Sequence, residues 1–240
     1  IISTGGTARA IEDAGVPVTP IEEFTGYPEM MDGRVKTLHP KVHGALLARR
    51  DSEQHMQEAA QHGIKLIDLV VVNLYEFEKT VANPEVTFAD AIEHIDIGGP
   101  SMVRGGAKSH ATVAIVTDPA DYALAASRVA DGTGFSLDER KWLAAKAFAN
   151  TAAYDATINE WTAKHWPKPA SIEQPVSEGE TEVNEAKFPA TFTRTWDRAH
   201  VLRYGENPHQ HASFYKTPDR RPGVATAKQL QGKELSYNNI

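Results

Sequence analysis

The sequence of 240 residues contains no cysteine, so disulfide bonds and thiolate metal sites are excluded and a reducing compartment suits the chain. It also lacks any apolar run of the roughly 18 residues that a membrane-spanning helix needs, and no basic-then-apolar signal peptide opens it. These absences predict a soluble, cytoplasmic protein without a membrane partner. The ten histidines remain as candidates for metal binding.

Basic residues are also fewer than acidic ones. Lysine and arginine number 25 against 32 aspartates and glutamates, which gives a formal net charge of -7. A general binder of nucleic acid or of membrane surfaces needs a broad basic field. We therefore expect no nucleic-acid partner, and any basic site must be local. The composition, 41% hydrophobic and 24% charged, is typical of a globular protein with one sizeable core.

Strand and helix signals alternate along most of the chain. The apolar runs at 67–74 and 113–116 predict buried strands. Ser52, Thr87 and Ser136 are each followed by the pattern expected after a helix N-cap. The alternation predicts an α/β fold with a mostly parallel sheet flanked by helices.

The chain divides into two parts by composition. Residues 1–166 carry the α/β pattern, and the first two residues enter a glycine turn so abruptly that we expect a first strand and helix upstream. Within them, proline and glycine are too frequent at 17–50 for long regular elements, and a loop of this length is usually functional. Residues 167–200 have the proline- and glutamate-rich composition of a linker. Residues 201–240 would begin a second α/β domain, too short for a core of its own.

A glycine turn lies between the first apolar residues and the first helical segment, at Thr4-Gly5-Gly6-Thr7. Such a turn lets backbone N–H groups converge on an anion while the helix dipole adds a favourable potential. The spacing matches neither a P-loop nor a dinucleotide fingerprint, so a plain tight turn explains it equally well.

A local basic cluster follows in the segment 33–43, which holds one arginine, two lysines, two histidines and a threonine. The repulsion among these charges would be relieved by a dianionic phosphate, to which arginine gives a forked contact and lysine a compact charge. A solvated basic loop is the alternative. His39 and His43 have the spacing of metal ligands on a helix, but Pro40 between them disfavours that helix, and we expect no metal site.

A third group surrounds a predicted helix start at Gly98-Gly99. Asp96 precedes the helix and Lys108 lies near its end. Alone, they are a helix cap and a surface charge. Together with Tyr75, at the carboxyl end of the strand 67–74, they would supply acid, base and oxyanion partners where α/β sheets usually bind ligands.

Several blocks, in this order, resemble the AICAR transformylase/IMP cyclohydrolase family, and the resemblance covers nearly the whole chain. They are STGGT at 3–7, GYPEM at 26–30, GRVKTLHPKVHG at 33–44, VVNLYEF at 71–77, IDIGGPSMVRGGAKSH at 95–110, KAFANTAAYD at 146–155 and LRYGENPHQ at 202–210. The last block resembles the start of the family's transformylase domain.

The resemblance implies a role in purine nucleotide biosynthesis. Residues 1–166 would form a methylglyoxal-synthase-like domain that closes formyl-AICAR to IMP with loss of water and without a cofactor. The full-length protein would also formylate AICAR, with 10-formyltetrahydrofolate as co-substrate, and would form a homodimer. The family's Lys-His pair for formyl transfer is not among these residues, so we expect no formyl transfer by this chain alone.

The resemblance also assigns residues. The catalytic positions are Lys108, as acid/base, with Lys36, Tyr75 and Asp96. The substrate-binding positions are Thr4, Gly5, Gly6, Thr7, Arg34, Val35, Thr37, Asn73, Leu74, Ile97, Gly98, Arg203 and Tyr204.

Three other functions stay open. A nucleotide-sensing regulatory module of the same fold would not need the catalytic set. A methylglyoxal-synthase-type lyase shares the glycine turn, but the basic segment and Arg203-Tyr204 disfavour it. An interaction fragment whose partner supplies the activity would show no turnover with formyl-AICAR.

Overall fold

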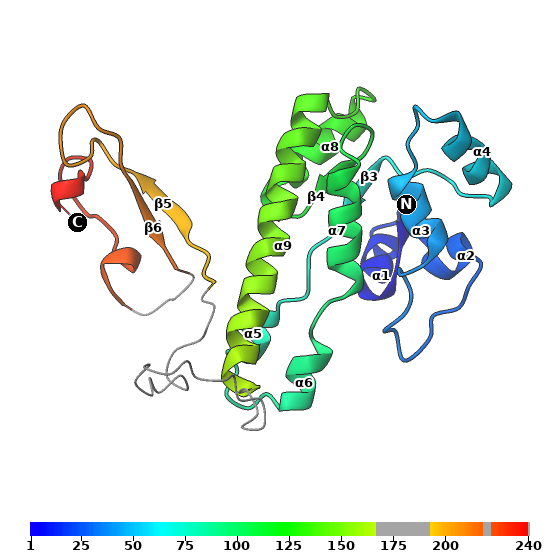
Figure 1. The fold of residues 1–240 in the computed structure, drawn as a ribbon, viewed down its shortest axis with the longest axis horizontal. Coiled ribbons are helices and arrows are strands. Elements are labelled where there is room, and N and C mark those ends of the chain that lie inside the picture. Colours follow the sequence, from blue (N-terminus) through cyan, green and yellow to red (C-terminus); the bar gives the residue numbers. More distant parts are fainter. Residues whose placement is uncertain (167–192, 218–221, 240) are drawn as a thin grey trace, which may run out of the picture. The chain divides into compact units, whose positions relative to one another are not determined.

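The computed structural model describes residues 1–166, 193–217 and 222–239. They belong to two compact units, Ile1–Trp161 and Thr162–Ile240 (Figure 1). Most of the expected linker at 167–200 therefore lies outside the described residues. None of the described helices combines the length and the apolar character needed to cross a lipid bilayer.

Short strands and helices alternate in the first unit. The strands are β1 (Ile2–Ser3), β2 (Thr19–Pro20), β3 (Leu69–Val71) and β4 (Ala114–Val116). The helices are α1 (Gly5–Asp13), α2 (Ile21–Thr25), α3 (Pro40–Leu47), α4 (Glu53–Gln61), α5 (Phe77–Val81), α6 (Phe88–Glu93), α7 (Gly98–Lys108), the 3-10 turn η1 (Pro119–Asp121), α8 (Tyr122–Ala130) and α9 (Leu137–His165).

The strands of this unit pair in parallel. β1 lies beside β2 with Ile2 opposite Thr19, and β3 lies beside β4 with Val70 opposite Ile115. Parallel neighbours need a crossover connection, and the helices between the paired strands provide it. The predicted α/β fold with parallel strands is confirmed, in the form of two small strand pairs.

Local capping chemistry sets several helix starts. The Ser52 hydroxyl accepts a hydrogen bond from the amide of His55 before α4, and the Thr87 hydroxyl accepts one from the amide of Asp90 before α6. Ser136 begins α9 in the same way. All three predicted N-caps are confirmed, because a cap depends only on residues within one turn of itself.

The treatment of Pro40 as a helix breaker was wrong. Pro40 is the first residue of α3, where its missing N–H would have had no partner within the helix. The Nδ1 atom of His39, the N-cap, accepts a hydrogen bond from the amide of Lys41 at 3.1 Å. The segment 17–50 therefore contains regular elements (β2, α2 and α3), all short.

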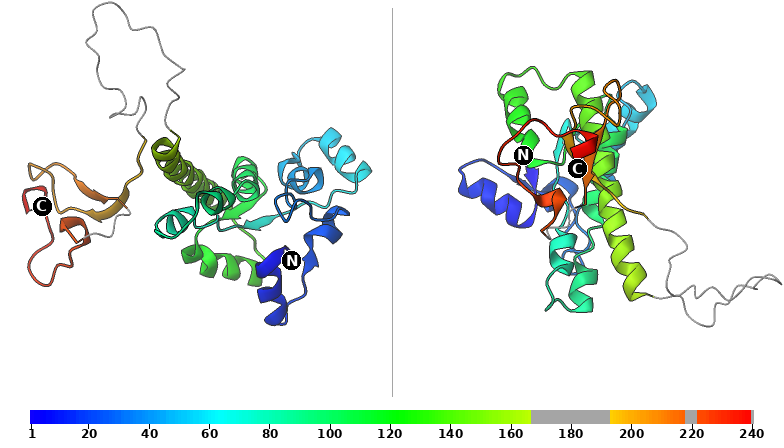
Figure 2. Two further views of the ribbon diagram at one scale, coloured as in Figure 1. Left: turned by 90° about the horizontal axis from the view of Figure 1, so that it is seen from below. Right: turned by 90° about the vertical axis from the view of Figure 1, so that its left-hand side faces the viewer.

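Helix α7 lies at the centre of the unit. Val103 and Ala107 of α7 are fully buried in one cluster with Leu46 of α3 and Ile115 of β4. A Cβ added at Gly106 would lie 3.3 Å from the Cβ of Ile115, so the absence of a side chain lets α7 approach β4 closely. Two alanines of α9 join this cluster, and α9 runs beside α7 in Figure 1; Figure 2 gives two further views.

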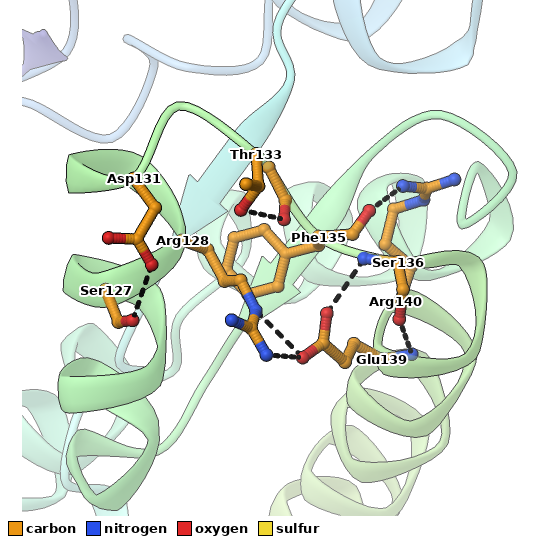
Figure 3. A network of polar contacts seen from close by, with 9 residues as sticks. Ser127, Arg128, Asp131, Thr133, Phe135, Ser136, Glu139 and Arg140 are labelled. Atoms are coloured by element: carbon orange, nitrogen blue, oxygen red, sulfur yellow. Dashed lines mark hydrogen bonds and ion pairs between the residues drawn. The ribbon is translucent and has the colours of Figure 1, made fainter.

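Helix α9 is tied to α8 by a polar network (Figure 3). The Arg128 guanidinium donates two hydrogen bonds to Oε1 of Glu139, at 2.9 and 2.5 Å, and the amide of Ser136 donates to Oε2 at 2.8 Å. These contacts lower the pKa of Glu139 to about 2, and the hydrogen bonds from Arg128 make the largest contribution to this shift. Its carboxylate therefore stays charged well below the pH at which a free glutamate is protonated.

In the second unit, β5 (Asp197–Val201) and β6 (Ser213–Lys216) form an antiparallel pair with Val201 opposite Ser213. The 3-10 turns η3 (Val224–Thr226) and η4 (Tyr237–Asn239) follow. Leu202, Gly205 and Ser236 are its buried residues within the described ranges.

The network at Glu139 predicts a pH-dependent contribution to stability. Because the folded pKa lies below the ordinary value of 4.5, the contribution is present above pH 4.5 and is lost as the pH falls toward 2. Glu139→Gln should therefore lower the melting temperature at pH 7, and the difference from the unchanged chain should shrink as the pH falls from 5 to 3. Asp138→Asn is the matched control, since it removes one negative charge from the same first turn of α9, where the Asp138 side chain is 95% exposed and has a long contact of 3.8 Å with Lys141. A difference that does not vary with pH would contradict the assignment.

Candidate functional site

The strands β3 and β4 end at the same edge of the sheet, and α/β proteins usually bind ligands at this edge. After β3 the chain leaves the sheet through Asn73, Leu74 and Tyr75. The Asn73 amide donates to the carbonyl oxygen of Thr117, just beyond β4, at 3.2 Å, and its oxygen accepts a hydrogen bond from the hydroxyl of Tyr122. Asn73 thus joins the two strand exits, and its side chain is anchored to the protein.

Asp96 lies at the same edge and caps α7. Its Oδ1 accepts a hydrogen bond from the amide of Gly99 at 2.8 Å, and its Oδ2 accepts a longer one from the amide of Tyr75 at 3.4 Å. The dipole of α7 favours a negative charge at this end. A single carboxylate therefore links the exit of β3 to the start of α7. We call Tyr75, Asp96, Gly98, Gly99 and Thr37 the Asp96 corner.

Two glycines make the Asp96 corner compact. A Cβ at Gly98 would lie 2.6 Å from Oγ1 of Thr37, and a Cβ at Gly99 would lie 2.3 Å from Oδ2 of Asp96. Both distances are shorter than any real contact, so only glycine fits at either position without movement. Thr37 is buried against α7 as a result, and the basic segment 34–37 reaches the start of that helix.

A small hairpin presents the basic side chains. Met30 and Val35 pair through two backbone hydrogen bonds, and Met31 and Asp32 at its tip have the positive φ angles 55° and 53°. Positive φ is unfavourable for residues with a side chain, and Asp is among those that tolerate it. This hairpin was not expected from the sequence, although the Asp32-Gly33 pair is typical of tight turns.

Each of the two cations beside the Asp96 corner faces a carboxylate. Lys36 Nζ lies 3.6 Å from Oε2 of Glu29, and Arg34 Nε lies 3.5 Å from Oε2 of Glu93. The Lys36 side chain is 25% exposed, whereas that of Arg34 is 64% exposed. Ion pairs this exposed contribute roughly 0–1 kcal/mol, so an anionic ligand could replace either carboxylate.

The structure does not bring Lys108 to this corner. Lys108 is the last residue of α7 and Gly98 the first, and at 1.5 Å per residue they lie about 15 Å apart. Because α7 runs from the carboxyl edge of β3 back to the start of β4, Lys108 lies near the opposite edge of the sheet. Its side chain is exposed there.

The glycine turn has the expected strand and helix on either side, with α1 starting at Gly5. Thr4 is the N-cap, but its side chain makes no capping hydrogen bond, and Thr7 is exposed. Within residues 1–166, no hydrogen bond or ion pair joins 3–7 to the basic segment 34–37. A phosphate held by both segments therefore stays a prediction.

Tyr154 is a residue of the Asp96 surroundings to which the sequence analysis gave no role. Its hydroxyl accepts a hydrogen bond from the amide of Asp96 at 2.8 Å. Burial raises the pKa of Tyr154, so the phenol stays neutral. The only sequence feature that pointed to Tyr154 was its place in the block KAFANTAAYD at 146–155. Tyr154 and Asp96 are 58 residues apart in the sequence.

In the second unit, Arg203 and Tyr204 contact each other. The guanidinium of Arg203 donates to the Tyr204 hydroxyl at 3.1 Å and lies 4.8 Å from the centre of its ring. A hydrogen bond with Ser236, and then Arg203 itself, lower the pKa of Tyr204. Backbone bonds from Arg203 to Leu235 and from Tyr237 to Tyr204 hold the pair in place.

In the three described ranges, no three or more histidine, aspartate and glutamate side chains come together in a way that would hold an ion. The Nε2 atom of His43 is buried without a hydrogen-bond partner, and burial lowers the pKa of this histidine.

Family models match both parts of the chain. A model described as an MGS-like domain matches residues 1–101, and one described as the AICARFT/IMPCHase bienzyme matches residues 106–240.

The chain is similar to named proteins of other organisms and to a protein of solved structure. "Bifunctional purine biosynthesis protein PurH" of Halalkalibacterium halodurans is 50% identical over 241 positions, covering 100% of this chain and 44% of that protein. The protein of the same name from Listeria monocytogenes is 52% identical with the same coverage. A solved structure described as "Crystal structure of ForH" is 37% identical, with a TM-score of 0.62, over 70% of this chain and 86% of that one. The chain thus spans less than half the length of these curated relatives.

The glycine pair predicts a position-specific cost in stability. Gly99→Ala should displace the Asp96 carboxylate and lower the free energy of unfolding by about 1.5–3 kcal/mol, the cost of a lost hydrogen bond to a charged group. Gly105→Ala is the matched control on the same helix, because its Cβ would meet Leu46 at an ordinary 3.7 Å. Alanine is the better helix former, so this control should be neutral or stabilising. Urea unfolding of both variants measures the difference; equal effects would contradict the role given to Gly99.

Proposed function

Because the chain belongs to the AICARFT/IMPCHase bienzyme family, we propose that residues 1–166 act as an IMP cyclohydrolase, which closes formyl-AICAR to IMP with loss of water. The reaction needs no cofactor. The carboxamide nitrogen of the substrate attacks its formyl carbon, so the enzyme must orient two arms of one ring, remove a proton and stabilise an oxyanion.

One observation carries the proposal: the close approach of Thr37 to the start of α7 at Gly98. Through it, three distant segments of the chain come together: the basic segment that carries Lys36, the exit of β3 that carries Tyr75, and the turn before α7 that carries Asp96. The resemblance assigns a catalytic role to each of these three residues. Their segments belong to the kind of sheet edge where α/β proteins usually bind ligands, which supports the proposal.

The chemistry of each side chain suits a part of the reaction. The Asp96 carboxylate, anchored by the amides of Gly99 and Tyr75, can accept a hydrogen bond from the attacking carboxamide. Lys36 can donate to the developing oxyanion or to the phosphate. The Tyr75 side chain is exposed and so accessible to a ligand, and its phenol can donate as well.

We assign the phosphate of the substrate to the glycine turn Thr4-Gly5-Gly6-Thr7 and to Arg34, whose ion pair with Glu93 is exposed. Val35, Asn73, Leu74 and Ile97 would contact the nucleotide mainly through their backbone. For Asn73 this follows from its anchored side chain.

The second activity belongs to the longer protein. We propose that Arg203 and Tyr204 bind AICAR there and that 10-formyltetrahydrofolate is the co-substrate. The homodimer expected from the resemblance and the cytoplasmic location expected from the composition accompany this proposal. The pairing of Arg203 with Tyr204 supports the first assignment, because a held guanidinium is ready for an anionic ligand.

A nucleotide-sensing module is the second candidate. The distance of about 15 Å between the two ends of α7 favours it, because a sensor would not need Lys108 beside Asp96. Turnover separates the two: the chain would bind IMP in both cases but would form it only as an enzyme.

The enzymatic proposal predicts turnover that depends on both lysines. With formyl-AICAR, the appearance of IMP absorbance should fall by about 10²–10⁴-fold in Lys36→Ala, which would lose the donor to the oxyanion. On the acid/base role that the resemblance gives to Lys108, the same loss is expected in Lys108→Ala, while IMP binding stays measurable in both variants. Lys65→Ala is the control, since Lys65 lies on the exposed approach to β3. Unchanged turnover in Lys108→Ala would remove its acid/base role and leave Lys36 as the catalytic lysine. Bound IMP without turnover in the unchanged chain would favour the sensor.

For the second activity, a chain of these 240 residues given AICAR and 10-formyltetrahydrofolate should yield no formyl-AICAR. The reason is that the Lys-His pair of the family is not among them. Formylation detected by chromatography would refute this expectation.

A further inference from the structure

The turn between α6 and α7 carries the Asp96 backbone, and a residue from α9 holds it. The Tyr154 hydroxyl accepts a hydrogen bond from the amide of Asp96 at 2.8 Å and donates a longer one to the carbonyl oxygen of His94 at 3.4 Å. A phenol has one donor and free lone pairs, so both bonds can exist together. One oxygen therefore bridges two backbone groups of the turn just before the carboxylate.

Tyr154 is itself held by aromatic packing. Its ring lies edge-on to that of Phe77, with 6.5 Å between the centres, and Phe77 is 1% exposed. Phe77 also packs edge-on against Trp161, and Trp161 stacks on Phe88. The Tyr154 ring thus packs against a buried aromatic residue that is itself held by a second ring, which limits the positions open to the Tyr154 hydroxyl.

The same ring connects Tyr154 to the other side of the Asp96 corner. Phe77 is the first residue of α5, and its amide donates to the carbonyl oxygen of Tyr75 at 2.8 Å. Tyr154 thus contacts the segment of Asp96 through its hydroxyl and the segment of Tyr75 through its ring. The two segments also meet directly, where the Asp96 carboxylate accepts from the amide of Tyr75.

We propose that Tyr154 is a positioning residue for the ring closure, which fixes the Asp96 carboxylate over the start of α7 by holding the backbone of the turn before it. The inference rests on the proposed cyclohydrolase function. Tyr154 acts through Asp96 and need not touch the substrate.

The test is a double-mutant cycle in the full chain with formyl-AICAR as substrate. Tyr154→Phe removes one oxygen and keeps the ring, so it should lower kcat by about tenfold to a hundredfold with KM changed less than about twofold. In the Asp96→Asn background the same change should have almost no further effect, because the group that it positions has already been altered. Tyr215→Phe, on β6 of the second unit, is the matched control and should leave kcat unchanged.

A second measurement does not need turnover. The amide of Asp96 should exchange with deuterium at least about tenfold faster in Tyr154→Phe, while the amides of Val103 and Ala107 in the core of α7 keep their protection. Faster exchange of all these amides would mean a general loss of structure and would overturn the positioning role.

The outcomes separate the two proposals. No turnover in the unchanged chain would defeat the proposed function. Normal turnover in the unchanged chain together with an unchanged kcat in Tyr154→Phe would defeat only this inference. Equal losses on adding Tyr154→Phe to the unchanged chain and to Asp96→Asn would also defeat it, since independent effects add.

Discussion

The capping of α7 by the Asp96 carboxylate is the interaction on which the site depends. It satisfies the amide of Gly99, which has no partner inside the helix, and it places a negative charge where the helix dipole stabilises it. The same carboxylate reaches the exit of β3 at Tyr75. Loss of this one group would therefore leave an unpaired helix end and release the contact between two segments of the site.

Close packing at both ends of α7 supports that arrangement. Glycines at 98 and 99 admit Thr37 and the carboxylate at the start of the helix, and glycine at 106 admits Ile115 of β4 further along. A longer side chain at the first two positions would separate the segments that meet there. The glycine content of α7, which lowers its intrinsic helix propensity, is balanced by the contacts that only glycine allows.

What could be predicted from the sequence was mostly local. The N-caps at Ser52, Thr87 and Ser136 followed from neighbours within one turn, and the parallel strands followed from the alternation of elements. Pro40 was misjudged because its effect depends on its position in the helix. The segments of the Asp96 corner were recognised singly, but the contact of Thr37 with α7 depends on tertiary packing.

Tyr154 and Lys108 differ in how far their positions could be predicted from the sequence. Tyr154 could not be predicted, because its partner is 58 residues away and no local pattern connects them. The separation of Lys108 from Gly98, in contrast, could have been calculated from the sequence, because it follows from the length of the expected helix between them.

The carboxylates of Glu29 and Glu93 partly neutralise the basic segment 34–37. Its crowded charges suggested strong self-repulsion, yet Lys36 and Arg34 already face an internal anion each. A phosphate that binds here would have to replace these glutamates as the partner of Lys36 and Arg34, while the two carboxylates remain on the protein and repel it. The glutamates would therefore compete with any anion for these two cations, and a dianion, with its larger Coulomb attraction, would displace them more readily than a monoanion.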